Sequence, residues 1–305
     1  MSEQDQAFTA SDIEHALDDR QFELWFQPQY DLQSRTIAAC EGMARWRHPV
    51  LGLLPPGLFL GAVRHHGLMP EFTRCVVALG GKAQARWNSE GHYWRLNLNI
   101  AASDLSEPSF ALLAEAELDA VGMVPDKVTF EVPENDFHKG GKVALRGAEN
   151  LRRANFGLAV EARGAAVMPD GLIAGGPFTE FKLSGPTLLR MGAVQLRTGG
   201  GLVGARLRAA QSGGLPAVAV GAENEMVLKA LGEMGFEQAQ GHALAPAAPL
   251  RDILARAPKP DAAPKRKAAT VSEESLQYEN LIREARRTRM DQADNEAGEA
   301  EIEAA

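Results

Sequence analysis

Short runs of apolar residues, most of them alternating with polar ones, recur along the first 250 positions of the chain and predict β-strands. They lie at residues 22–28, 36–46, 94–100, 125–132, 156–161, 179–183, 215–220 and 236–241. Within 94–100, Leu96 and Leu98 share one face, and Asn97 and Asn99 share the other. Stretches with helical periodicity separate most of these runs, so strands and helices alternate.

This alternation predicts a TIM-type (β/α)8 barrel, followed by a C-terminal linker and helix. An open doubly wound sheet is the alternative. That fold favours a glycine-rich phosphate loop after an early strand, whereas Gly199-Gly200-Gly201 lies late in the chain. In a barrel, polar residues at the carboxyl ends of the strands gather at one rim. The residues so placed are Glu41, Asn99, Glu131, Glu161, Lys182 and Gln240.

Glu41 is the most unusual of these residues, because it follows the apolar segment 37–40 and precedes Met43. An ionised carboxylate in such surroundings requires a cation, a hydrogen-bond network or solvent at a strand end. Both a strand that reaches water and a polar pocket satisfy this requirement, and the pattern around Glu41 does not choose between them.

The chain divides into five predicted segments. A lead-in helix occupies 1–20 and the barrel 21–256, and a Pro/Ala/Lys linker follows at 257–269. An amphipathic helix with a basic end is expected at 270–290, and an acidic disordered tail at 291–305.

Composition and charge narrow the classes of function. The chain has 305 residues, of which 45% are hydrophobic, and its net charge is −8, so we expect a globular protein that does not bind DNA. No apolar run is long enough to span a membrane, and the first residues are polar and acidic, which predicts a cytoplasmic protein. Cys40 and Cys75 are too few for a disulfide framework.

An ordered set of motifs covers most of the barrel. Its members are Phe26-Gln27-Pro28, Glu41-Gly42-Met43-Ala44-Arg45-Trp46, Leu98-Asn99-Ile100, Glu131-Val132-Pro133-Glu134, Phe181-Lys182-Leu183, Val218-Ala219-Val220-Gly221-Ala222-Glu223 and Gln240-Gly241. Through these motifs, residues 12–250 resemble the EAL domain, a bacterial barrel that hydrolyses cyclic di-GMP in its active form.

The resemblance implies roles for the rim residues. Carboxylates and an asparagine that suit Mg²⁺ or Mn²⁺ correspond to Glu41, Asn99, Glu131 and Glu161. A lysine that orients the attacking water corresponds to Lys182. Residues that bind the ligand correspond to Gln27 and Arg45, because a guanidinium matches the geometry of a phosphate.

Two departures from the family pattern remove the expected chemistry. Ala162 stands where the family has the carboxylate of a second metal ion, and Val220 stands where it has the catalytic glutamate. Losing a positioned base typically costs about 10²- to 10⁴-fold in rate. We therefore expect no catalytic residue and no required cofactor, with at most one weakly bound Mg²⁺ or Mn²⁺. The vestiges of the catalytic machinery are Lys182, Gln240, Glu134 and Glu223.

Further substitutions near these positions are Arg163-Gly164-Ala165-Ala166 after the altered pair, Ser184 after the lysine strand and Pro133 in the fourth motif. The chain is thus expected to be a degenerate EAL protein, a pseudo-phosphodiesterase of cyclic di-GMP signalling. It would act as a non-hydrolysing cyclic di-GMP receptor, as a protein-interaction module, or as both. The alternatives are a protein-binding scaffold that has lost the nucleotide and, third, an active phosphodiesterase. A protein partner would use the barrel surface or helix 270–290.

Overall fold

The computed structural model describes residues 8–163, 167–184, 201–222 and 224–258. All of them belong to one compact unit, which spans residues 1–259. The predicted helix at 270–290, the tail at 291–305 and all but the first two residues of the predicted linker lie outside the described residues. The predicted division of the chain into five segments therefore stays a prediction.

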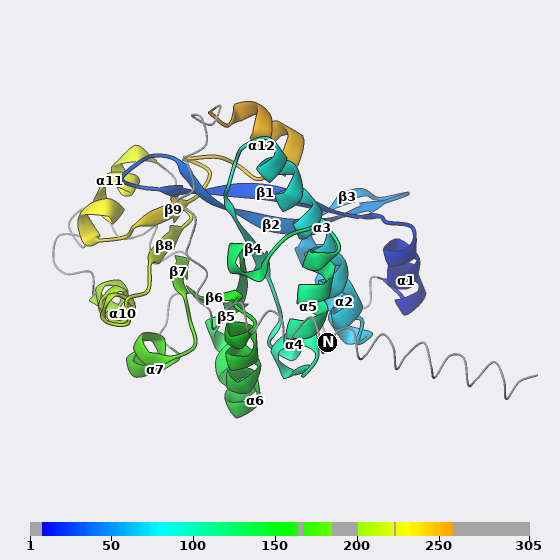
Figure 1. Ribbon diagram of the computed structural model, residues 1–305, viewed down its shortest axis with the longest axis horizontal. Helices are drawn as coiled ribbons and strands as arrows, with labels where there is room; N and C mark the ends of the chain where they lie inside the picture. Colours follow the sequence, from blue (N-terminus) through cyan, green and yellow to red (C-terminus); the bar gives the residue numbers. More distant parts are fainter. Residues whose placement is uncertain (1–7, 164–166, 185–200, 223, 259–305) are drawn as a thin grey trace, which may run out of the picture. The chain divides into compact units, whose positions relative to one another are not determined.

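Ten strands of the described residues form one sheet, and eight of them close into a barrel; Figure 1 shows their arrangement. The barrel strands are β1 (Phe22–Asp31), β2 (Ile37–His48), β4 (Arg95–Asn99), β5 (Val128–Pro133), β6 (Gly157–Arg163), β7 (Glu180–Ser184), β8 (Ala217–Val220) and β9 (Gln238–Gln240). They neighbour one another in this order, and β1 closes the ring by pairing with both β2 and β9. The short strands β3 (Gly52–Leu54) and β10 (Ala248–Pro249) add to β2 and β1. The predicted barrel is confirmed.

The direction of the first strand distinguishes this barrel from a regular (β/α)8 barrel. The other seven barrel strands, β2 and β4 to β9, run parallel to one another, but β1 is antiparallel to both of its barrel neighbours, β2 and β9. A tight turn follows Asp31, whose carboxylate accepts hydrogen bonds from the backbone N–H groups of Gln33 and Ser34. So short a connection can only join antiparallel strands, since a parallel crossover needs a dozen or more residues.

Helices lie around the strands in Figure 1. They are α1 (Ala10–Asp18), α2 (Pro56–His65), α3 (Met69–Ser89), α4 (Ala102–Ser106), α5 (Phe110–Asp119), α6 (Glu134–Arg153), α7 (Asp170–Gly175), α10 (Gly201–Ser212), α11 (Glu225–Met234) and α12 (Leu250–Arg256), with a 3-10 turn at Pro125–Lys127. No helix in the described part of the chain has the length and apolar character needed to cross a membrane.

Alternation along the central strands separates an apolar shell from a polar barrel interior. Phe130 on β5 packs against Phe110 of α5 and against Phe156, while its neighbour Glu131 contacts Lys182 inside the barrel. Because successive side chains of a strand point to opposite faces, one residue of each pair meets the helices and the next meets the barrel axis. The barrel therefore carries charge at its centre.

Candidate functional site

A buried lysine lies at the centre of the polar interior. The Lys182 Nζ atom, on β7, lies 2.6 Å from Glu131 Oε1 of β5 and 3.1 Å from Glu41 Oε2 of β2. The Lys182 side chain is 1% exposed. Lys182 is 51 residues from Glu131 and 141 residues from Glu41 in the sequence, so the barrel topology is what brings these three groups together.

Two amides also donate hydrogen bonds to the Glu41 carboxylate. Asn99 Nδ2 donates to Glu41 Oε1 at 2.7 Å, and Gln240 Nε2 donates to Glu41 Oε2 at 2.8 Å. Gln240 Nε2 also donates to Gln27 Oε1, and Gln27 in turn donates to the carbonyl of Ala245. The structure thus gathers six residues, five that the sequence placed at the rim and Gln27 of the opening motif, and Glu41 is buried in their network rather than at a strand end open to water.

The two carboxyl groups around Lys182 respond differently to burial. Burial alone would raise the pKa of Glu41, but the Lys182 ammonium and the hydrogen bonds from Asn99 and Gln240 outweigh it and hold that pKa below its usual range. Burial and the nearby Glu41 charge raise the pKa of Glu131 to about 8, against the opposing pull of Lys182. Burial would lower the pKa of Lys182, but the surrounding carboxylates raise it. These opposite shifts make Glu41 the group that balances the Lys182 ammonium most strongly, and they favour the protonated form of Glu131.

A second polar layer lies one step further into the barrel. Glu180 is fully buried and accepts hydrogen bonds from Arg95 at 2.8 Å and from Asn97 at 3.4 Å. Gln29 Nε2 donates to Gln238 Oε1 at 2.6 Å. Sequence reasoning did not single out these residues as a layer, although Asn97, Glu180 and Gln238 each lie two positions before a rim residue on the same strand, and that spacing was the available signal.

Glu161 is not brought into the lysine cluster. Its Oε2 atom accepts hydrogen bonds from Arg163 Nε at 3.2 Å and Arg163 Nη2 at 2.8 Å, and its Oε1 atom accepts one from Ser184 Oγ at 2.8 Å. The four residues predicted as metal ligands therefore divide into two separately balanced groups.

This arrangement does not fit a pair of metal ions. Arg163 and Ser184 occupy both oxygens of Glu161, and Lys182 lies between Glu41 and Glu131. Among the described residues, no group of three or more His, Cys, Asp or Glu side chains is placed to hold a metal ion. A single weak Mg²⁺ or Mn²⁺ site at Glu41, Asn99, Glu131 and Glu161 stays a prediction.

The two substituted positions carry apolar side chains. Ala162 is 1% exposed and belongs to the hydrophobic core, and its strand neighbour is Leu183. Val220 is the last residue of β8 and lies beside Gln240 in the parallel register. Neither side chain can accept a proton or bind a metal ion. Glu223 lies outside the described residues.

Two other predicted site residues lie away from Lys182. Arg45 is four residues beyond Glu41 on β2, and its guanidinium lies over the Trp25 ring, 5.4 Å from the ring centroid, and donates to the Ala44 carbonyl. Glu134 begins α6 and accepts hydrogen bonds from the N–H groups of Val167 and Met168.

Glu134 also forms a buried ion pair with Arg206 of α10, so its contacts anchor the chain after β6. The sequence offered no local signal for this pair, because the two residues are 72 positions apart.

A cavity of about 450 Å³ opens beside the rim. Glu41 and Asn99 line it together with Arg163, Arg64 and Asp136, and its wall includes apolar side chains such as Leu60, Phe72 and Ile100. A concave apolar wall with a few convergent charged groups is typical of a small-ligand site.

Comparison with known proteins identifies the fold family. Residues 10–247 match the family described as the EAL domain. The chain belongs to the EAL domain family. The cyclic di-GMP phosphodiesterase RocR of Pseudomonas aeruginosa is 27% identical over 246 residues, which cover 81% of this chain and 62% of that protein. The chain thus spans about three fifths of the length of its first curated relatives.

Solved EAL domains share the fold. The PaMucR phosphodiesterase in its cyclic di-GMP complex superimposes with a TM-score of 0.72 and 23% identity, covering 80% of this chain and 98% of that one. The FimX EAL domain from Pseudomonas aeruginosa, bound to cyclic di-GMP, superimposes with a TM-score of 0.69 and 22% identity, covering 78% of this chain and 95% of that one. The predicted membership of the EAL family is confirmed.

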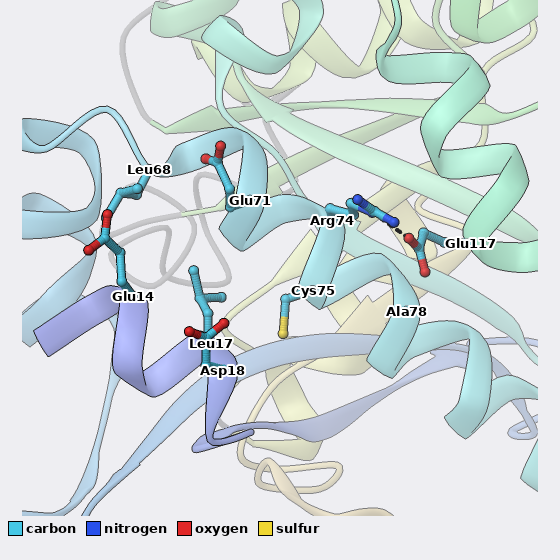
Figure 2. A pocket seen from close by; sticks show the side chains of 9 residues that line it. All are labelled: Glu14, Leu17, Asp18, Leu68, Glu71, Arg74, Cys75, Ala78 and Glu117. Carbon is cyan, nitrogen blue, oxygen red and sulfur yellow. Dashed lines mark hydrogen bonds and ion pairs between the residues drawn. The ribbon is translucent and has the colours of Figure 1, made fainter. Parts of the chain in front are cut away.

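A second hollow, of about 570 Å³, lies between α1, α3 and α5 of this EAL domain (Figure 2). Its polar groups include Glu14, Glu71 and an ion pair of Arg74 with Glu117, whose shortest distance is 2.5 Å. Burial raises the pKa of the Cys75 thiol in this hollow, so the thiol is a poor nucleophile at neutral pH. The rim cavity is therefore the stronger candidate for the functional site.

Replacing the central lysine tests the charge balance of the cluster. Lys182→Met leaves the Glu41 carboxylate buried without its cation, and we expect the free energy of unfolding to fall by about 3–5 kcal/mol. The double variant Lys182→Met/Glu41→Gln removes the stranded charge and should recover part of the loss. Urea unfolding followed by circular dichroism measures both. An equal loss in the single and double variants would contradict this balance.

The raised pKa of Glu131 predicts a pH dependence of stability. Between the ordinary pKa of 4.5 and the folded value of about 8, the folded state holds a proton that the unfolded state releases. The free energy of unfolding should therefore fall as pH rises through this window, by at most about 1.4 kcal/mol per pH unit. Glu131→Gln cannot lose this proton, so its stability relative to the unaltered protein should increase from pH 5 to pH 8. Parallel stability profiles of the two proteins would show that Glu131 is ionised throughout.

Proposed function

We propose that this chain is a catalytically inactive EAL-domain regulator that binds cyclic di-GMP without hydrolysing it. The observation that carries the proposal is the pairing of a retained polar rim with two apolar substitutions. Gln27, Asn99 and Lys182 lie in one connected network, while Ala162 and Val220 supply neither a metal-binding carboxylate nor a base.

The chemistry of phosphodiester hydrolysis explains why these substitutions matter. Water must be activated, its proton accepted, and the charge on the phosphate oxygens neutralised. Glu131 accepts a hydrogen bond from Lys182 and its raised pKa favours the protonated form, while both oxygens of Glu161 already accept hydrogen bonds. Binding needs only donors to the phosphates, so it can persist where turnover does not.

Relatives support cyclic di-GMP as the ligand. RocR is named a cyclic di-GMP phosphodiesterase, and the PaMucR and FimX EAL domains were solved with cyclic di-GMP bound. We propose that Gln27 and Arg45 contact this ligand and that the regulator reports its binding to a protein partner. The barrel surface and the segment 270–290, for which the sequence predicts a helix, are the proposed contact regions for that partner.

Isothermal titration calorimetry of the full chain with cyclic di-GMP in Mg²⁺ buffer tests whether the chain binds this nucleotide. We expect saturable binding at one site and a rise in the unfolding temperature, since a ligand that binds only the folded state stabilises it. Arg45→Ala should weaken binding about 10- to 100-fold, as expected for a lost charged contact. Arg47→Ala is the matched control, because Arg47 lies two residues away on β2 and pairs with Glu23 on the surface.

The absence of both binding heat and thermal stabilisation at high cyclic di-GMP concentration would contradict the proposal that the chain is a cyclic di-GMP receptor. The chain would then be better described as a protein-binding scaffold that has lost its nucleotide.

A further inference from the structure

Two arginines from different elements line the rim cavity. Arg163 ends β6 and Arg64 lies in the last turn of α2, and both contribute to the wall that also contains Glu41 and Asn99. The sequence separation of the two arginines is large, so the barrel and its surrounding helices bring them to the same cavity. Neither residue was singled out from the sequence as a ligand contact.

Both guanidinium groups have donors to spare. Arg163 uses its Nε atom and its Nη2 atom on Glu161, and its Nη1 atom has no partner among the described residues. The Arg64 guanidinium makes no hydrogen bond or ion pair with any part of the chain that the structure describes, and Arg64 is an exposed residue. A guanidinium carries five N–H donors in a planar fork. Both residues can therefore donate hydrogen bonds to a phosphate without giving up their present contacts.

Arg163 also occupies the place beside Glu161 that a metal ion would need. Its two hydrogen bonds neutralise Glu161, so a divalent cation could reach that carboxylate only by displacing the guanidinium. A guanidinium and a bound cation would therefore compete for the same group. In this chain the guanidinium is covalently attached and already in place.

We propose that Arg163 and Arg64 form a phosphate-binding pair that holds one phosphodiester group of cyclic di-GMP without a divalent cation. This inference rests on the proposed function, because it takes cyclic di-GMP as the ligand. It assigns the positive charge at this end of the site to residues of the chain itself. The apolar wall near Leu60 and Phe72 offers a surface for the uncharged part of the same nucleotide.

Titration of the full chain with cyclic di-GMP in EDTA and in Mg²⁺ tests the pair. We expect the unaltered protein to bind equally well in both buffers. Arg163→Ala and Arg64→Ala should each weaken binding in EDTA about 10- to 100-fold. Because Arg163→Ala frees Glu161, added Mg²⁺ should restore part of the affinity of that variant.

The matched control is Arg74→Ala. Arg74 is 62% exposed and pairs with Glu117 in the second hollow, much as Arg163 is 66% exposed and pairs with Glu161 (Figure 2). This variant should bind as the unaltered protein does. Arg163→Lys keeps the charge but loses the fork, and we expect it to bind more tightly than Arg163→Ala. Unfolding temperatures of all variants show whether a loss of binding comes from misfolding.

The outcomes separate this inference from the proposed function. Binding by the unaltered protein in Mg²⁺ but not in EDTA would overturn the arginine pair and leave the receptor intact. Unchanged affinity of folded Arg163→Ala and Arg64→Ala in EDTA would also overturn the pair. A lack of cyclic di-GMP binding in both buffers would contradict the proposed receptor function, and with it the phosphate-binding role of Arg163 and Arg64.

Discussion

The Lys182 ammonium is the interaction on which the rest of the site depends. It is fully enclosed by a barrel whose interior also contains Glu41, Glu131 and Glu180. A buried cation is tolerable only where carboxylates and amides surround it, and each of those groups must be held by its own strand. Strands β2, β4, β5, β7 and β9 all contribute, so closure of the barrel and balance of the charge are one requirement.

The same interaction limits the chemistry of the rim. Glu41 balances the lysine, the raised pKa of Glu131 favours its protonated form, and Arg163 and Ser184 donate hydrogen bonds to both oxygens of Glu161. The EAL fold is retained together with a polar floor for a ligand, but its acidic groups are satisfied by the chain itself. By resemblance to the EAL family, Ala162 and Val220 stand where groups that activate water are expected. A binding site without turnover is the function that we propose on these grounds.

Strand positions and the rim were predictable because a period of two and strand-end polarity are local signals. Glu41, Glu131 and Lys182 could be grouped from the sequence once the barrel was assumed, even though 141 residues separate the outer pair. The direction of β1 was not predicted, although the short turn after Asp31 implies it. Sequence resemblance grouped Glu161 with the predicted metal ligands. In the structure Glu161 forms an ion pair with Arg163, two residues away on the same strand.

Contacts between distant helices and loops were beyond reach from the sequence. Glu134 lies in a motif that resembles a catalytic one, yet it holds the chain after β6 with help from Arg206 of α10. Arg64 carries no motif at all and becomes relevant only because α2 places it beside the rim cavity. Such residues are defined by packing, and packing has no short-range signature in a single chain.

A single-turnover assay with the protein in excess over cyclic di-GMP, in Mg²⁺ or Mn²⁺, tests the central claim most directly. Chromatography of the nucleotides would follow the conversion of cyclic to linear dinucleotide. The account predicts bound but intact cyclic di-GMP, with no linear product above the protein-free reaction. Linear product that disappears in the Glu41→Ala variant would contradict it and establish this chain as a working phosphodiesterase.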